Sequence, residues 1–300
     1  MDEKNIKRVV FRDCIDYLMD QEFWDGTAHL FDTLRARHDA PHRINFEATY
    51  DLPSLRNVPI TKLTLENEYR DLEIDIDRLP PTLTELIINT CTRFIPLIDL
   101  RGLTLLKKLS ISDLDGQPLD GSRLPPSLTC LRLDSKFNQE VINLPTTITD
   151  MIVWTRAYEL GPNNLTIRRL ELYDPSVERN TDALITLDFP KMRSLLLDTV
   201  PRSEIYSRIT SDNFPILETL DLGQTTMLFN QYNLSTLPSS LKTLTISVCR
   251  PISWLPCYLE SLTITFEAPD LTISSVKWSP STPMIKTMHL VSYGQVLLKE

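Results

Sequence analysis

The stretch Leu237-Pro-Ser-Ser-Leu-Lys-Thr-Leu-Thr-Ile246 sets the pattern for most of this chain. A proline stands near its start, and the spacing Leu-x-x-Leu-x-Ile follows. Because successive side chains of a strand point to opposite faces, Leu244 and Ile246 share one face, and Thr243 and Thr245 share the other. The stretch therefore predicts a short strand with one apolar and one polar face, introduced by a proline turn.

The same spacing of apolar residues recurs along the chain. The strand-like segments are residues 60–65, 83–88, 106–111, 128–133, 148–153, 167–172, 192–197, 217–222, 241–246, 259–264 and 285–290. Their starts lie 18 to 26 residues apart, about 22 on average. Residues 42–50, with Ile44 and Phe46, are interpreted as a degenerate copy ahead of the series. This is the period of leucine-rich repeats, which bury one continuous core when they stack.

The repeats and the first forty residues together predict the fold class. We expect an α/β-type repeat solenoid: a leucine-rich-repeat-like curved parallel sheet of about 11 short strands, with a small N-terminal helical cap. Residues 4–20 and 22–37 carry apolar side chains at roughly helical intervals, and Pro41 ends any helix there. The predicted domains are a helical cap over residues 1–42 and a solenoid over residues 43–300. Between strands we expect extended turns and a few short helical turns.

The approach to most strands is an apolar residue followed by proline. The apolar residues are Leu79, Leu124, Leu144, Phe189, Phe214, Leu237 and Leu255. Because proline cannot donate to a strand ladder, it marks the turn before each strand. We expect the apolar residue before each proline to anchor the far side of its coil.

Two copies share more than leucine and proline. Phe137-Asn-Gln-Glu-Val-Ile-Asn-Leu-Pro-Thr-Thr-Ile148 and Phe229-Asn-Gln-Tyr-Asn-Leu-Ser-Thr-Leu-Pro-Ser-Ser-Leu241 resemble the FNIP repeat, a relative of the leucine-rich repeat. The resemblance covers roughly residues 60–290 and implies that the Phe fills the interior of the convex side. Many FNIP proteins begin with an F-box-like helical segment that recruits a cullin-based ubiquitin ligase. The first forty residues here have about that length, but they lack the Leu-Pro opening of such a segment.

Composition excludes several function classes. The net charge of −9 disfavours nucleic acid and anionic membrane surfaces, which attract clustered Lys and Arg. With only 7 glycines against 21 prolines and no glycine-rich phosphate motif, a nucleotide site is not expected. The charged N-terminus leads into no apolar run, so we expect no signal peptide, and no run of apolar residues is long enough to predict a membrane span. The five cysteines, Cys14, Cys91, Cys130, Cys249 and Cys257, form no C-x-x-C pair and predict reduced thiols in a cytoplasmic protein.

The outward-facing strand positions form columns across the predicted sheet. Towards the C-terminus these columns are mostly Thr and Ser, which suit a strand without further function. In the middle the columns carry Arg132, Ile152, Trp154, Arg169, Glu171, Tyr173 and Leu196. Because Trp, Tyr and Arg are enriched at interface hot spots, we predict that these seven residues bind another protein. Alternatively, Trp154 and Tyr173 fold over irregular repeats, since the spacing there shrinks to 20 and 19 residues.

The sequence offers little to catalysis or metal binding. His29, His38 and His42 lie close together, but Pro41 interrupts their spacing and no cysteine is near. Strand-like alternation explains the carboxylates of Glu73 and Asp75 without any chemistry. We therefore predict a non-catalytic protein-protein interaction scaffold with no cofactor. The alternative is a substrate-recognition adaptor of a cullin-type ubiquitin ligase, recruited through residues 1–42, with ligase components as further partners.

Overall fold

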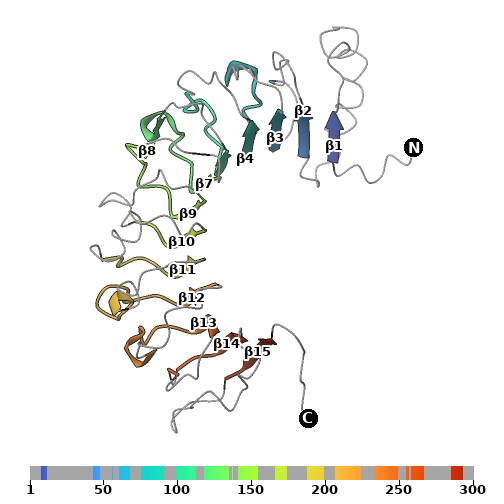
Figure 1. The fold of residues 1–300 in the computed structure, drawn as a ribbon. Helices are drawn as coiled ribbons and strands as arrows, with labels where there is room; N and C mark the ends of the chain where they lie inside the picture. Colours follow the sequence, from blue (N-terminus) through green and yellow to red (C-terminus); the bar gives the residue numbers. More distant parts are fainter. Residues whose placement is uncertain are drawn as a thin grey trace. The chain divides into compact units, whose positions relative to one another are not determined.

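The computed structural model describes sixteen stretches of the chain. They are residues 8–11, 43–47, 56, 61–67, 76–90, 99–112, 118–134, 137, 141–154, 166–173, 188–198, 207–223, 234–248, 255–256, 258–266 and 285–292. The chain divides into two compact units, Met1–Ile148 and Thr149–Glu300, and each is described by itself. In each unit short parallel strands succeed one another in chain order, as expected of a repeat solenoid (Figure 1).

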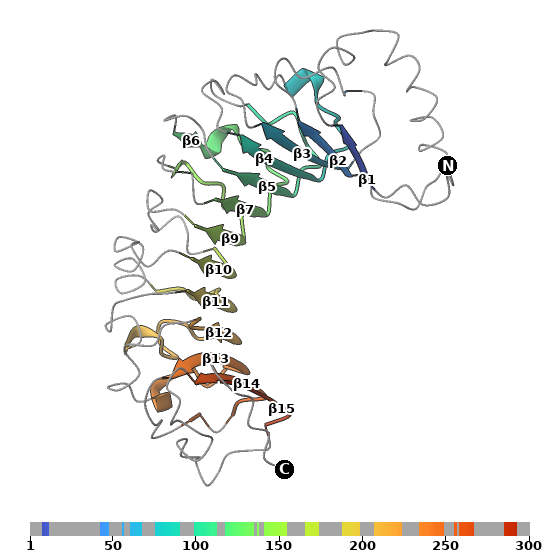
Figure 2. The ribbon, with the colours of Figure 1, turned by 45° about the vertical axis from the view of Figure 1, so that its right-hand side comes forward.

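The described part of the Met1–Ile148 unit contains a parallel sheet of six strands. They are β1 (Arg8–Phe11), β2 (Arg43–Glu47), β3 (Lys62–Asn67), β4 (Glu85–Thr90), β5 (Lys108–Ile111) and β7 (Cys130–Leu133). Each strand pairs with the next in parallel. A second parallel pair, β6 (Leu119–Asp120) and β8 (Val141–Ile142), lies apart from this sheet (Figure 2). The two coils that begin with β5 and β7 are therefore joined at two places.

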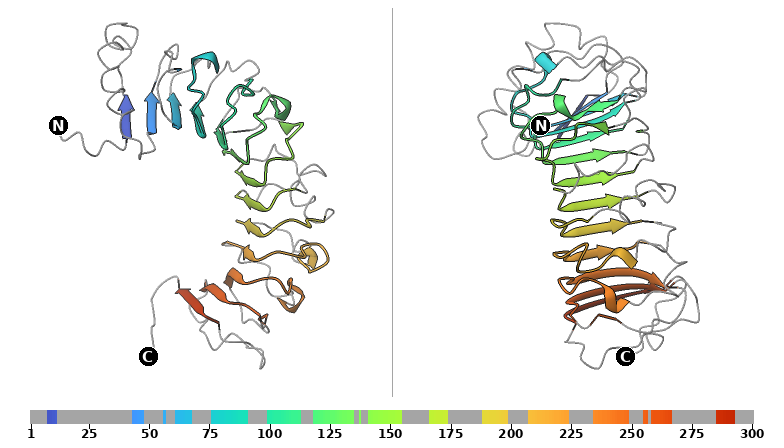
Figure 3. Two further views of the ribbon diagram at one scale, coloured as in Figure 1. Left: turned by 180° about the vertical axis from the view of Figure 1, so that it is seen from behind. Right: turned by 90° about the vertical axis from the view of Figure 1, so that its left-hand side faces the viewer.

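The described part of the Thr149–Glu300 unit contains a parallel sheet of seven strands. They are β9 (Asp150–Val153), β10 (Arg169–Leu172), β11 (Ser194–Leu197), β12 (Thr219–Asp221), β13 (Thr243–Val248), β14 (Ser261–Phe266) and β15 (Thr287–Ser292). The arrows run side by side in one direction, from yellow-green to red in Figure 3. All eleven predicted strands, together with the degenerate copy at β2, are confirmed.

Each of the eleven strands begins two residues after its predicted start. In seven of these repeats the first apolar residue closes a turn instead: Leu83, Leu106, Leu128, Ile148, Met192, Leu217 and Leu241. Leu241, for example, donates its N–H to the carbonyl of Pro238 at 3.0 Å. The next two N–H groups, of Lys242 and Thr243, then share the carbonyl of Glu218 in the preceding coil at 2.8 and 3.0 Å. This shared acceptor recurs from coil to coil and satisfies backbone groups that a turn would otherwise leave unpaired.

The interior consists of apolar residues from the strands and from the proline turns. Of the residues that precede proline, Leu79, Leu124, Phe189, Phe214, Leu237 and Leu255 are buried and Leu144 is half-buried. Phe189 and Phe214 stack with ring centroids 5.5 Å apart. Phe137 is fully buried, which confirms the interior position that the sequence predicts for it. Phe229 lies outside the described residues.

Short 3-10 helical turns lead into three of the proline turns. They are η2 (Ile76–Arg78), η3 (Gly121–Arg123) and η5 (Leu234–Thr236), and they confirm the predicted short helical turns. The serine of Leu-Pro-x-Ser-Leu also has a structural role. Ser127 Oγ donates to the Leu106 carbonyl at 2.8 Å, and Ser240 Oγ donates to the Leu217 carbonyl at 2.9 Å. The serine thus satisfies a carbonyl of the preceding coil.

Two parts of the predicted fold class are not supported by the described residues. The helix expected over residues 4–20 is interrupted by β1, in which Val9 and Phe11 are in register with Ile44 and Phe46 of β2. β-branched and aromatic residues favour a strand, and pairing with β2 outweighs a weak helical period. The other residues of the predicted cap lie outside the described part. The α/β character is also not observed, because the described residues form strands, turns and very little helix.

Candidate protein-binding face

The strands β9, β10 and β11 bring most of the predicted binding residues onto one face of the sheet. Ile152 is in register with Glu171, and Glu171 with Leu196. Trp154 and Tyr173 come directly after β9 and β10, and the N–H of Tyr173 still donates to the Val153 carbonyl at 3.0 Å. We call the face made by these five residues and Arg169 the β9–β11 face. Arg132, the seventh predicted residue, lies half-buried on β7 of the other unit.

The two aromatic rings of this face are packed against each other. The centroids of Trp154 and Tyr173 are 3.9 Å apart, and their planes differ by 5°. Both side chains are half-buried. Because Trp and Tyr supply large apolar surfaces with few rotatable bonds, this stack forms a stiff platform beside the solvent.

Glu171 links the aromatic pair to an arginine. It is only 7% exposed, although its position in the strand alternation places it on the outward face. Its Oε1 accepts from Arg169 Nε at 2.8 Å, and its Oε2 accepts from the Tyr173 hydroxyl at 2.8 Å. A buried carboxylate needs such partners, because removing its charge from water is costly. The guanidinium of Arg169 keeps an exposed side, since 55% of that side chain remains accessible.

The surroundings of Tyr173 shift its ionisation. Burial of the ring, together with its hydrogen bond to the Glu171 carboxylate, raises the pKa of Tyr173 to about 12. The phenol is therefore a neutral hydrogen-bond donor over the whole physiological range. At neutral pH the face therefore combines the Arg169–Glu171 ion pair, the neutral hydroxyl of Tyr173 and the Trp154–Tyr173 stack, each in contact with the next.

The structure adds two carboxylates that the sequence analysis did not single out. Asp198 comes directly after β11, and its N–H donates to the Leu172 carbonyl at 2.8 Å, which places it beside Tyr173. Asp221 lies on β12, in register with Leu196. Gly223 occupies the position after β12 that corresponds to Asp198 after β11, and the two residues are neighbours. The sequence does contain a signal for them. Asp198 and Asp221 occupy outward positions of two neighbouring repeats, and Gly223, one of only 7 glycines, follows at a position where the other repeats carry a side chain.

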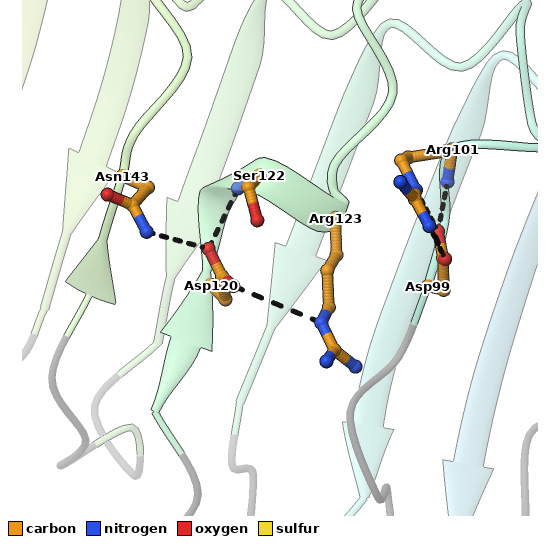
Figure 4. A network of polar contacts seen from close by, with 6 residues as sticks. All are labelled: Asp99, Arg101, Asp120, Ser122, Arg123 and Asn143. Carbon is orange, nitrogen blue, oxygen red and sulfur yellow. Dashed lines mark hydrogen bonds and ion pairs between the residues drawn. The ribbon is translucent and has the colours of Figure 1, made fainter.

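A separate polar cluster in the Met1–Ile148 unit stabilises the coil rather than forming a site. Asp120 Oδ1 accepts from the Ser122 N–H at 2.9 Å and from Asn143 Nδ2 at 3.1 Å (Figure 4). These bonds, led by that of the Ser122 N–H, lower the pKa of Asp120. Gly121 has no room for a side chain, since a Cβ there would lie 2.3 Å from the Asn143 carbonyl oxygen. The cluster caps η3 and joins β6 to β8.

The described residues show no group of three or more His, Cys, Asp and Glu that could hold a metal ion. Within the same stretches, no helix has the length and hydropathy needed to cross a bilayer. His289, the histidine of the outward columns, is an exposed residue of β15. In comparisons with known proteins, no protein-family model and no curated protein matches this chain.

Proposed function

We propose that this protein is a non-catalytic interaction scaffold that binds another protein through the β9–β11 face. The Trp154–Tyr173 stack, connected through the buried Glu171 to the exposed Arg169, is the observation that carries the proposal. Ion pairing and stacking restrict these side chains before any partner arrives, which lowers the entropy that binding costs. Trp, Tyr and Arg are also the residues most enriched at the energetic centre of interfaces.

The likeness to FNIP-type leucine-rich repeats supports the same proposal. The buried Phe137 and the serine bonds to the preceding coil give a physical role to the Phe and to the Leu-Pro-x-Ser-Leu element of that repeat. Repeat solenoids of this kind present long faces that suit binding to other proteins. We favour the sheet over an N-terminal recruiting module as the partner-binding part, because Arg8–Phe11 form β1 and pair with β2.

The proposal is tested by replacing Trp154 and Arg169, the first and last side chains of the series that runs through Tyr173 and Glu171. We expect the Trp154→Ala and Arg169→Ala variants to fold, as judged by circular dichroism, and to lose partners that the wild-type chain captures. Each partner identified by mass spectrometry is then purified and titrated, and a loss of about tenfold or more in affinity is expected for an anchor residue. Ser261→Ala and Thr263→Ala on β14 are the matched controls on the same unit. Unchanged affinity in both folded anchor variants would show that binding lies elsewhere.

A further inference from the structure

The outward columns of the Thr149–Glu300 unit carry an excess of negative charge. Their acidic residues are Asp150, Glu171, Asp198 and Asp221, and their basic residue is Arg169, with His289 counted as neutral. Arg169 is committed to Glu171 through its ion pair. The acidic residues lie on β9, β10 and β12 and directly after β11, whereas the face of β13 and β14 is made of Ser and Thr. The excess negative charge is therefore confined to the β9–β11 face and to the acidic residues that adjoin it, which we call its acidic border: Asp150, Asp198 and Asp221.

Asp198 and Asp221 come together at Gly223. The N–H of Gly223 donates to Asp221 Oδ1 at 2.9 Å. On the other side, Asp198 Oδ1 lies 2.6 Å from the point where a Cβ on Gly223 would be. Gly223 also has a φ of 52°, which favours glycine. A glycine thus allows two carboxylates to approach the same stretch of backbone, next to the Trp154–Tyr173 stack.

The electrostatics agree with this geometry. Burial raises the pKa of Asp221, the Gly223 N–H opposes that shift, and the negative charges of Asp198 and Glu171 add to it. Asp198 also contributes to the raised pKa of Tyr173. The two pKa shifts have the direction expected if these acidic groups act on one another and on Tyr173. A positive charge placed there would relieve the repulsion.

We infer that the partner presents a basic segment to this face, with a lysine or arginine side chain against Asp198 and Asp221 and its aliphatic stem beside the Trp154–Tyr173 stack. The inference rests on the proposed function and names the chemistry of its partner. A guanidinium or ammonium group pairs with carboxylates and also interacts favourably with aromatic rings, while its stem packs on apolar surface. An acidic partner would meet like charges at the same place, which opposes binding.

Short fluorescein-labelled peptides test the inference against the full-length chain. One peptide alternates arginine with leucine, a second replaces arginine with glutamine, and a third replaces it with glutamate. Fluorescence anisotropy is expected to show binding of the arginine peptide alone, with affinity that decreases as salt increases. The Asp198→Asn/Asp221→Asn variant should bind the arginine peptide about tenfold more weakly, the equivalent of two modest charge interactions.

A charge-matched variant separates a specific site from general attraction. Glu218→Gln/Glu260→Gln removes the same net charge from half-buried residues that directly precede β12 and β14, where Glu218 pairs with Arg193 and Glu260 with Lys286. This variant should bind the arginine peptide as the wild type does. Equal weakening in both double variants, or equal binding of all three peptides, would overturn the inference.

The two proposals fail in different ways. If captured partners depend on Trp154 but bind the Asp198→Asn/Asp221→Asn variant normally, the basic partner is wrong and the binding face stands. If captured partners are indifferent to Trp154, the proposed function itself is wrong, whatever the peptides do.

Discussion

Strands β9–β11 and strands β13–β14 belong to the same compact unit and bury the same kind of interior, yet they present different outward faces. Leu170 in β10 and Leu244 in β13 are both fully buried. Outward, β13 and β14 carry Thr243, Thr245, Ser247, Ser261, Thr263 and Thr265, whereas β9–β11 carry the stacked rings, the ion pair and two aliphatic side chains.

This difference separates what the fold requires from what it leaves free. A coil needs apolar side chains at alternate strand positions and a proline turn before them. The outward positions are satisfied by β-branched threonine, which suits a strand without further contacts. Where the sequence instead places Trp154, Glu171 and Tyr173, it buries a carboxylate that the fold does not need. That cost is the physical reason for interpreting the β9–β11 face as functional.

The largest expected effects come from removing a buried leucine, and they test whether β9–β11 and β13–β14 depend equally on their interior packing. Leu170→Ala and Leu244→Ala should each lower the free energy of unfolding by about 2–5 kcal/mol, through lost burial and the cavity left behind. The midpoint of urea unfolding, monitored by circular dichroism, measures both. A much smaller loss for Leu170→Ala would mean that β9–β11 depend on their outward stack for packing, and the comparison would then favour a structural role for Trp154.

Hydroxyl hydrogen bonds on the two faces should differ in strength. Tyr173→Phe removes the donor to the buried carboxylate of Glu171 and is expected to cost about 1.5–3 kcal/mol, the range for bonds to charged groups. Ser247→Ala removes a 2.7 Å bond to the Gly223 carbonyl, and for a neutral pair we expect about 1 kcal/mol. Urea titration of both variants gives the ranking. The opposite ranking would show that water readily replaces the phenol at Glu171.

Much of the fold can be predicted from the sequence, because its period is repeated and each copy confirms the others. That support is absent at the N-terminus, where Val9 and Phe11 lie in a segment that stands ahead of the repeats and whose apolar spacing also fits a helix. Of the face, the columns could be derived from alternation alone. The ion pair and the stack could not, because they depend on side-chain rotamers and on the burial of Glu171, an acidic residue for which alternation predicts exposure.

The ionisation of Tyr173 gives a spectroscopic test of the β9–β11 face. Its pKa of about 12 exceeds the usual value of 10.0, so the neutral phenol stabilises the folded state below pH 10. That stabilisation should be lost as pH rises from about 10 to about 12. Phenolate absorbance in wild type minus Tyr173→Phe should therefore show one tyrosine titrating late. A difference curve centred near pH 10 would contradict the buried hydrogen bond to Glu171.

The smallest expected change in stability is that of Asp221→Asn, and whether the variant is more or less stable than the wild type is what matters. Burial and two negative neighbours raise the pKa of Asp221 above its ordinary 3.8, so its charged form destabilises the folded state. Asp221→Asn keeps an acceptor for the Gly223 N–H and should stabilise the protein at pH 7 by less than about 1 kcal/mol. The gain should disappear below pH 3.8, where the wild-type carboxyl is protonated in both states.

Thermal melts of the wild type and the Asp221→Asn variant at neutral and acid pH measure this gain, with Thr245→Val on β13 as the comparison from the other face. A residue retained at a cost to folding is expected where the face serves a partner. If Asp221→Asn instead destabilises the protein at neutral pH, the carboxylate serves the coil. The acidic border of the β9–β11 face would then be as structural as the threonines of β13 and β14.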